Sequence, residues 1–184
     1  YHAVRKAVPL LPPGSHAVVI GSGGLGHIGI QSLKALTAAE ITVLDRSDAA
    51  LQLAASLGAD HTVNSGDDAG KLLEITGGGA DVVFDFVGEH GTEALGITAL
   101  RNRGSYFSIG YGGAVNVDTI EIISREISVI GNLVGTYTDL VELMTLTAQG
   151  KVTLHTQIYD LEDAVQAMHD LDNGKLVGRG ILVP

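Results

Sequence analysis

The stretch Gly21-Ser-Gly-Gly-Leu-Gly26 decides the expected fold of this chain. It follows the β-branched run His16–Ile20 directly and leads into a segment of helical period. A glycine-rich turn between a strand and a helix leaves backbone N–H groups free to bind an anion. Gly21 permits the tight turn, Gly23 leaves room beside the backbone, and Gly26 lets the helix pack close to the strand. The pattern therefore predicts a turn that binds a pyrophosphate.

On both sides of that turn, short apolar runs alternate with segments of helical period, which is typical of a parallel sheet covered by helices. The expected strands cover residues 16–20, 41–44, 61–63, 81–87, 105–109 and 127–130. The expected helices lie near 25–36, 50–57, 92–100, 140–147 and 161–171, with Asp160 as the cap of the last one. We therefore expect an α/β protein with a Rossmann fold. Its doubly wound six-stranded parallel sheet, of order 3-2-1-4-5-6, would occupy residues 1–184 as one domain.

Composition narrows the classes of function. The 184 residues include no cysteine, and 21 acidic residues outnumber 11 basic ones, for a formal net charge of -10. This acidity disfavours binding to nucleic acid or to a membrane surface. The absence of cysteine excludes disulfide scaffolds, zinc ribbons and cysteine nucleophiles. Because 45% of the residues are hydrophobic and no apolar run approaches the ~20 residues of a membrane span, we expect a cytoplasmic protein with a sizeable core.

Asp45 is the expected ligand of an adenosine ribose. It ends the second expected strand, at the place where the dinucleotide fingerprint puts a carboxylate that accepts hydrogen bonds from ribose hydroxyls. The same charge would repel a 2'-phosphate, which favours NAD over NADP. Arg46 leaves the choice open, because its guanidinium could bind that phosphate or lie along the adenine.

Spacing reveals no catalytic and no metal-binding group. The seven histidines never occur four residues apart on one expected helix with a glutamate between them, and no nucleophile elbow or Tyr-x-x-x-Lys pair is present. Gly66-Asp-Asp-Ala-Gly-Lys71 has the Gly-Lys pair of a phosphate loop but not the Ser or Thr that should follow, so we expect a polar loop that enters a helix.

Phrases spread over the whole chain resemble the cofactor domain of the zinc-type alcohol dehydrogenases, within the medium-chain dehydrogenase/reductase superfamily. The phrases are Tyr1-His-Ala-Val4, Pro13-Gly14, Gly21-Ser-Gly-Gly-Leu-Gly-His27 with Gln31, Leu57-Gly-Ala-Asp60, Thr76-Gly-Gly-Gly-Ala-Asp81, Phe84-Asp-Phe-Val-Gly88, and Gly174-Lys-Leu-Val-Gly-Arg179 with Pro184. They occur in the family's order, which makes the match more specific than the glycine turn alone.

The resemblance implies which residues bind the cofactor. Backbone of the glycine turn would contact the pyrophosphate, residues after the fourth strand would line the adenosine and ribose side, and residues after the fifth and sixth would meet the nicotinamide and its carboxamide. The implied residues, in chain order, are Gly21, Gly23, Gly24, Leu25, Gly26, Asp45, Arg46, Phe86, Val87, Ile109, Gly110, Tyr111, Asn132, Leu133, Val134 and Arg179.

The resemblance also implies an activity for a longer parent enzyme, which is hydride transfer between a small alcohol or ketone and NAD(H). In this family the catalytic zinc and the proton relay belong to an N-terminal domain, and the chain begins at Tyr1 without that domain's cysteines. We therefore expect these residues to bind NAD without turning over substrate. The family pairs subunits at the sheet edge, and Glu121–Ile130 is apolar enough to form such an edge of a homo-oligomer.

Three alternatives share the glycine turn. A zinc-free quinone or enoyl reductase of the same superfamily would use this domain in the same way. A nucleotide-sensing module would bind the dinucleotide without hydride chemistry, although the residues from Gly174 to Pro184 argue against it. A methyltransferase would bind S-adenosylmethionine at a similar turn, and a comparative titration of that ligand and NAD distinguishes the two.

Overall fold

The computed structural model describes residues 1–65 and 69–184, and a parallel sheet forms its centre. Six strands lie in the order β3-β2-β1-β4-β5-β6, and each neighbouring pair is parallel. The strands are β1 (His16–Ile20), β2 (Glu40–Asp45), β3 (His61–Asn64), β4 (Ala80–Asp85), β5 (Leu100–Ser108) and β6 (Ser128–Gly131). This arrangement confirms the expected α/β Rossmann fold and its strand order.

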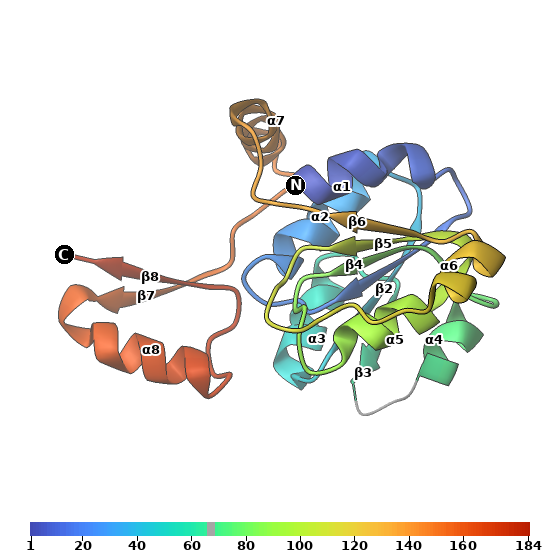
Figure 1. The fold of residues 1–184 in the computed structure, drawn as a ribbon. Coiled ribbons are helices and arrows are strands. Elements are labelled where there is room, and N and C mark those ends of the chain that lie inside the picture. Colours follow the sequence, from blue (N-terminus) through green and yellow to red (C-terminus); the bar gives the residue numbers. More distant parts are fainter. Residues whose placement is uncertain (66–68) are drawn as a thin grey trace.

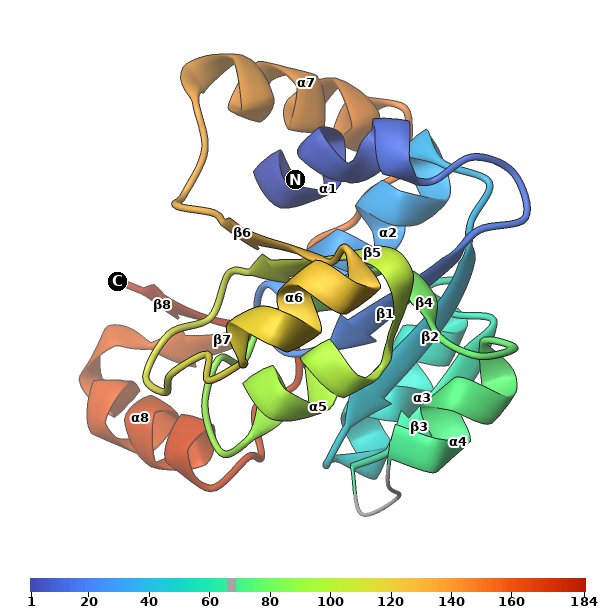
Figure 2. The same ribbon diagram turned by 45° about the vertical axis from the view of Figure 1, so that its right-hand side comes forward.

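Helices cover both faces of this sheet (Figure 1). They are α1 (His2–Ala7), α2 (Gly26–Leu36), α3 (Asp48–Ser56), α4 (Ala69–Ile75), α5 (Thr92–Thr98), α6 (Thr119–Arg125), α7 (Tyr137–Ala148) and α8 (Ala164–Asp172), with 3-10 turns η1 (Val8–Leu10) and η2 (Leu161–Asp163). Figure 2 shows α7 beside α1, so the first helix of the chain lies next to a helix that follows the sixth strand.

Alternation along β1 shows how the two layers of core form. Successive side chains of a strand point to opposite faces of the sheet. Val19 packs in a buried cluster with residues of α1, α2 and α3, whereas Val18 and Ile20 pack with residues of α4 and α5. Both faces of the strand are therefore covered, which is the reason that His16–Ile20 is apolar almost throughout.

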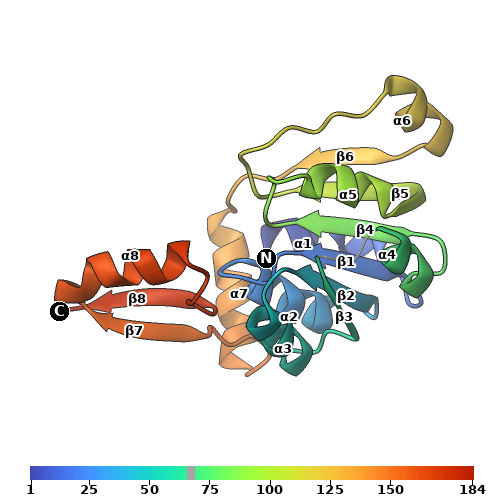
Figure 3. The same cartoon turned by 90° about the horizontal axis from the view of Figure 1, so that it is seen from below.

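A second, smaller unit follows the Rossmann sheet. The strands β7 (Thr156–Asp160) and β8 (Arg179–Val183) form a separate two-stranded parallel sheet, and α8 contacts both of them. Figure 3 shows this unit beyond the carboxyl ends of the central strands. The sequence analysis did not predict this sheet. Its helix also begins later than expected, since Asp160 precedes η2 and makes no side-chain cap hydrogen bond, while Asp163 precedes α8.

The expected edge segment Glu121–Ile130 was only partly right. Its first half belongs to α6, where Arg125 donates to Glu121 at 2.7 Å across one helical turn, and only Ser128–Gly131 is a strand. Glu126 ends the helix in the left-handed conformation, with φ of +51°. The apolar run therefore contains a helix, a reversal and the start of the short edge strand β6, which is shifted by one residue from the expected strand at 127–130.

Two further findings concern regions outside the sheet. Gly66 to Asp68, in the segment expected to be a polar loop, lie outside the described residues, and α4 begins at Ala69. Within residues 1–65 and 69–184, no helix is long and apolar enough to cross a membrane.

Candidate dinucleotide site

A cavity of about 540 Å³ opens at the carboxyl ends of β1, β2 and β4. This is the point where the strand order reverses between β1 and β4, and ligands of doubly wound sheets bind in the crevice there. Its lining residues are Ile20, Gly21, Gly23, Gly24, Leu25, Gly26, Leu44, Asp45, Arg46, Ser65, Phe86, Val87, Glu89, His90 and Arg179. Ten of the residues expected to bind the cofactor are thus gathered around one cavity.

At the floor of this cavity, glycine is required both in the turn and in the helix that follows it. Gly21 has a φ of +85°, and its N–H donates to the carbonyl of Leu44 at 2.8 Å. A Cβ added to Gly26 would lie 1.8 Å from the carbonyl oxygen of Gly21, and one added to Gly29 would lie 2.6 Å from the ring of Phe86. The glycines let α2 begin against the end of β1, as the fingerprint requires.

Gly23 differs from its neighbours because a Cβ added there would meet nothing within 4 Å. The space beside its backbone is therefore open toward the cavity, and a ligand can approach the chain closely at this point. On the next residue, the guanidinium of Arg179 donates from Nη2 to the carbonyl of Gly24 at 3.1 Å. Arg179 comes from β8, so the small second unit supplies a cation to the glycine turn.

Asp45 fixes the shape of the glycine turn from the end of β2. Its Oδ2 accepts hydrogen bonds from the N–H of Ser22 at 2.7 Å and from the hydroxyl of Ser22 at 3.0 Å, while Oδ1 accepts from the N–H of Ser47 at 2.9 Å. A carboxylate has about four acceptor positions, so one position remains for a ligand. Arg46, which follows it, is exposed at the rim of the cavity.

His27 lies buried under the turn and connects it to the second unit. Its Nδ1 lies 2.9 Å from the carbonyl of Gly23, and its Nε2 lies 3.4 Å from the N–H of His155. A carbonyl only accepts, so Nδ1 carries the proton and Nε2 is the acceptor of the neutral ring. Burial lowers the pKa of His27, and the nearby His155 and Arg179 also lower it, whereas the hydrogen bond that Nδ1 donates to the carbonyl of Gly23 raises it.

The loop after β4 forms the opposite wall. The buried carboxylate of Asp85 accepts from the N–H groups of Val87 and Gly88 at 2.9 and 2.8 Å and from the hydroxyl of Tyr106 at 2.7 Å. These bonds turn the backbone away from the sheet. They explain why β4 ends at Asp85, whereas the expected strand extended to residue 87.

Six of the residues expected to bind the cofactor do not line this cavity. Gly110 lies against the loop after β4, since a Cβ added to it would be 2.3 Å from the carbonyl of Val87. Tyr111, Leu133 and Val134 are 92%, 86% and 89% exposed, in the segments after β5 and β6. The six are Ile109, Gly110, Tyr111, Asn132, Leu133 and Val134.

The sequence analysis missed three polar residues of the cavity, Ser65 after β3 and the neighbours Glu89 and His90 after β4. The side chains of Glu89 and His90 lie 3.4 Å apart, and His90 has a φ of +59°, which is uncommon for a residue other than glycine. Their position just after the fourth strand, at the expected crevice, is the signal that could have identified them.

The described residues do not fit a zinc site, since no group of three or more His, Cys, Asp or Glu side chains within them could hold a metal ion. We therefore derive no step through a metal for this chain.

Known proteins resemble the chain over its whole length. It is 38% identical over 190 residues to an NAD-dependent alcohol dehydrogenase of Sulfurisphaera tokodaii, which covers 100% of this chain and 54% of that protein. The crystal structure of an alcohol dehydrogenase from Aeropyrum pernix matches it with a TM-score of 0.98 at 41% identity, over 100% of this chain and 54% of that one. Acetophenone reductase from Geotrichum candidum, solved in complex with NAD, matches with a TM-score of 0.87 at 26% identity, over 100% and 52%.

The chain thus spans about half the length of the relatives that it matches. Residues 24–149 match the family of zinc-binding dehydrogenases, and this match covers most of the Rossmann sheet together with the glycine turn from Gly24 onward. The expected resemblance is confirmed, and the chain belongs to the zinc-binding dehydrogenase family.

Proposed function

We propose that this chain is the NAD-binding domain of an alcohol dehydrogenase, in which hydride passes between a small alcohol or ketone and NAD(H). The observation that carries the proposal is the open space beside Gly23, just before the start of α2 and one residue from the carbonyl that binds Arg179. A helix start and a guanidinium both favour a pyrophosphate. The relatives named as NAD-dependent alcohol dehydrogenases support the choice of dinucleotide.

Bound NAD would supply the hydride chemistry through its nicotinamide ring. This chain contributes the contacts that hold the dinucleotide along its length. The glycine turn and Arg179 bind the pyrophosphate, Asp45 accepts from the adenosine ribose, and the segments after β5 and β6 contact the nicotinamide. Fixing the ring in one orientation raises the rate of transfer to a substrate held beside it.

The structure around Asp45 supports NAD over NADP. Three hydrogen bonds from Ser22 and Ser47 hold the carboxylate in place, so it cannot swing away to admit a 2'-phosphate. Arg46 is exposed at the rim of the cavity, and in the proposed complex its guanidinium would lie along the adenine.

We further propose that residues outside this chain hold the zinc that the family name implies. The whole protein is a homo-oligomer, which a sedimentation experiment tests. Its location is the cytoplasm, which cell fractionation tests.

A titration of the 184-residue chain with NADH, followed by nicotinamide fluorescence, tests the function. We expect saturable binding of NADH, weaker binding of NADPH, and no displacement of NADH by S-adenosylmethionine. Asp45→Ala should weaken NADH binding roughly tenfold, since it removes a hydrogen bond to a charged group, and should narrow the preference over NADPH. The ratio of the two affinities does not depend on the folded fraction, so it separates the loss of a ligand contact from a loss of stability. Equal NADH and NADPH binding by the unaltered chain, or an unchanged ratio in Asp45→Ala, would contradict the assignment.

A further inference from the structure

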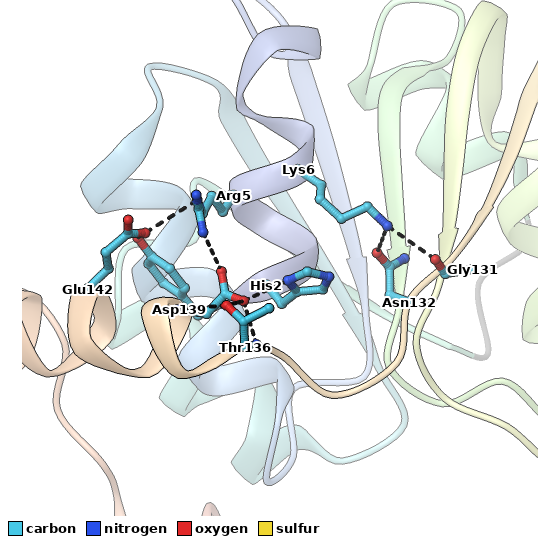
Figure 4. Close-up of polar contacts among 9 residues, drawn as sticks. His2, Arg5, Lys6, Gly131, Asn132, Thr136, Asp139 and Glu142 are labelled. Carbon is cyan, nitrogen blue, oxygen red and sulfur yellow. Dashed lines mark hydrogen bonds and ion pairs between the residues drawn. The ribbon is translucent and has the colours of Figure 1, made fainter.

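The segment Gly131–Thr136, which connects β6 to α7, is anchored at its first end by a lysine of the first helix. The N–H of Asn132 donates to the carbonyl of Ser108 at 3.0 Å, and its side-chain amide donates to that of Ile130 at 3.0 Å. Lys6 Nζ donates to Asn132 Oδ1 at 2.8 Å and to the carbonyl of Gly131 at 3.2 Å (Figure 4). Lys6 thereby orients an amide that joins the ends of β5 and β6.

The other end of the segment is anchored to the same helix through Asp139. Thr136 caps α7, and its N–H and hydroxyl each donate to Asp139 Oδ2 at 2.7 Å. The same carboxylate contacts His2 Nδ1 at 2.9 Å and accepts from Arg5 Nη1 at 2.8 Å, as Figure 4 shows. The hydrogen bonds from Thr136, then those from Arg5 and His2, hold the pKa of Asp139 well below its usual range, so the carboxylate stays charged.

Helix α1 can hold the segment because it is itself fixed to the core. Ala3, Val4 and Ala7 on its inner face are buried in the cluster that covers one side of the sheet. Its outer face presents Lys6 to Asn132 of the segment and Arg5 to Asp139 of α7, which binds Thr136. Because its apolar face is packed on the core and its two cations face outward, α1 holds Gly131–Thr136 in a fixed position relative to the sheet.

Between these two anchors, Leu133 and Val134 are almost fully exposed. Val134 has a φ of +49°, a strained conformation for a β-branched residue. Such strain persists only where the surrounding structure enforces it. The bond from Asn132 to Ser108 of β5 fixes the start of the segment, and the two anchors on α1 add polar contacts at both of its ends.

We propose that α1 is a positioning element for the nicotinamide, and that Lys6 and Arg5 hold Gly131–Thr136 so that the backbone at Leu133 and Val134 binds the carboxamide. This inference rests on the proposed NAD site, of which it concerns one end. Lys6 lies on a different helix from the glycine turn and does not line the cavity around it. Loss of the Lys6 amine should therefore weaken the binding of the nicotinamide and leave the binding of the ADP-ribose part of NAD unchanged.

The test compares the affinities of the 184-residue chain for NADH and for ADP-ribose, which lacks the nicotinamide. In Lys6→Met, which keeps the aliphatic stem and removes the donors, we expect the NADH affinity to fall roughly threefold relative to that for ADP-ribose, as for the loss of one exposed hydrogen bond. Lys6→Arg should restore most of the ratio. The fluorescence of bound NADH should change in Lys6→Met as well.

Lys34→Met is the matched control, because Lys34 is an exposed lysine that binds Asp60 near the other end of α2. It should leave both affinities unchanged. An unaltered ratio in Lys6→Met, or an equal loss of both affinities, would overturn the role of α1 and leave the NAD site in place. A folded chain that binds neither ligand would overturn the proposed function and this inference together.

Discussion

The glycine turn and the segment Gly131–Thr136 contact different parts of the proposed NAD, its central pyrophosphate and its nicotinamide, and they are built in different ways. The turn is held by contacts from its immediate surroundings, with Gly26 against the carbonyl of Gly21 and Asp45 on the N–H of Ser22. The segment after β6 is exposed in its middle and is held at its ends by side chains of the first helix.

The glycine turn and the segment Gly131–Thr136 should therefore respond differently to mutation. The glycine turn, where the pyrophosphate is proposed to bind, is closely packed, so a single methyl group can disturb both the fold and the binding of a ligand. The nicotinamide end has few buried contacts, so changes there should alter how the ligand is held and leave the stability of the domain nearly the same.

Gly26→Ala should have the largest effect. The new methyl group would lie 1.8 Å from the carbonyl oxygen of Gly21, and α2 would have to move away from the sheet. Overpacking of this kind costs about 1–3 kcal/mol or more. We expect a lower midpoint of thermal unfolding, measured by circular dichroism, together with loss of NADH binding. An unfolding midpoint equal to that of the unaltered chain would show that the turn is not closely packed.

Acidification should lower the stability of the folded chain by protonating His27, which lies under the glycine turn. Because its pKa in the folded chain lies below the 6.5 of an unperturbed histidine, the folded state binds fewer protons than the unfolded one in this range. Stability is therefore complete above about pH 6.5 and falls as the pH drops toward the lower folded pKa.

His27→Gln serves as the comparison for this pH dependence. Glutamine can donate to the carbonyl of Gly23 and accept from the N–H of His155, but it does not titrate in this range. Urea unfolding at pH 7.5 and 5.5 should show a smaller loss of stability in His27→Gln than in the unaltered chain. Equal losses would mean that His27 is not the group that titrates.

Val134→Gly should have a small effect on stability, and in the opposite direction. Glycine adopts the φ of +49° without strain, and the exposed valine side chain has little packing to lose. We expect a gain of about 0.5–1 kcal/mol in the free energy of unfolding. The looser backbone should also lower the affinity for NADH relative to that for ADP-ribose. A loss of stability would show that the valine side chain contributes packing at this end.

The same contrast explains how much the sequence could predict. The glycine turn, Asp45 and the strand order follow from local patterns, because strand, turn and helix succeed one another within about 30 residues. The contact between Lys6 and Asn132 joins residues 126 positions apart, and no local pattern signals it. The sheet of β7 and β8 was missed for a similar reason, since β7 is mostly exposed and has no continuous apolar run, and its partner β8 follows only after α8.

Gly23 allows the most direct measurement on the central claim, because it separates binding from folding. A methyl group at this position meets no protein atom within 4 Å, yet it would enter the space proposed for the pyrophosphate. Thermal unfolding should give equal midpoints for the 184-residue chain and its Gly23→Ala variant. Calorimetric titration of NADH should give an affinity about tenfold lower in the variant, corresponding to ~1.4 kcal/mol. Undiminished NADH binding by a folded Gly23→Ala variant would contradict the placement of the dinucleotide on this turn.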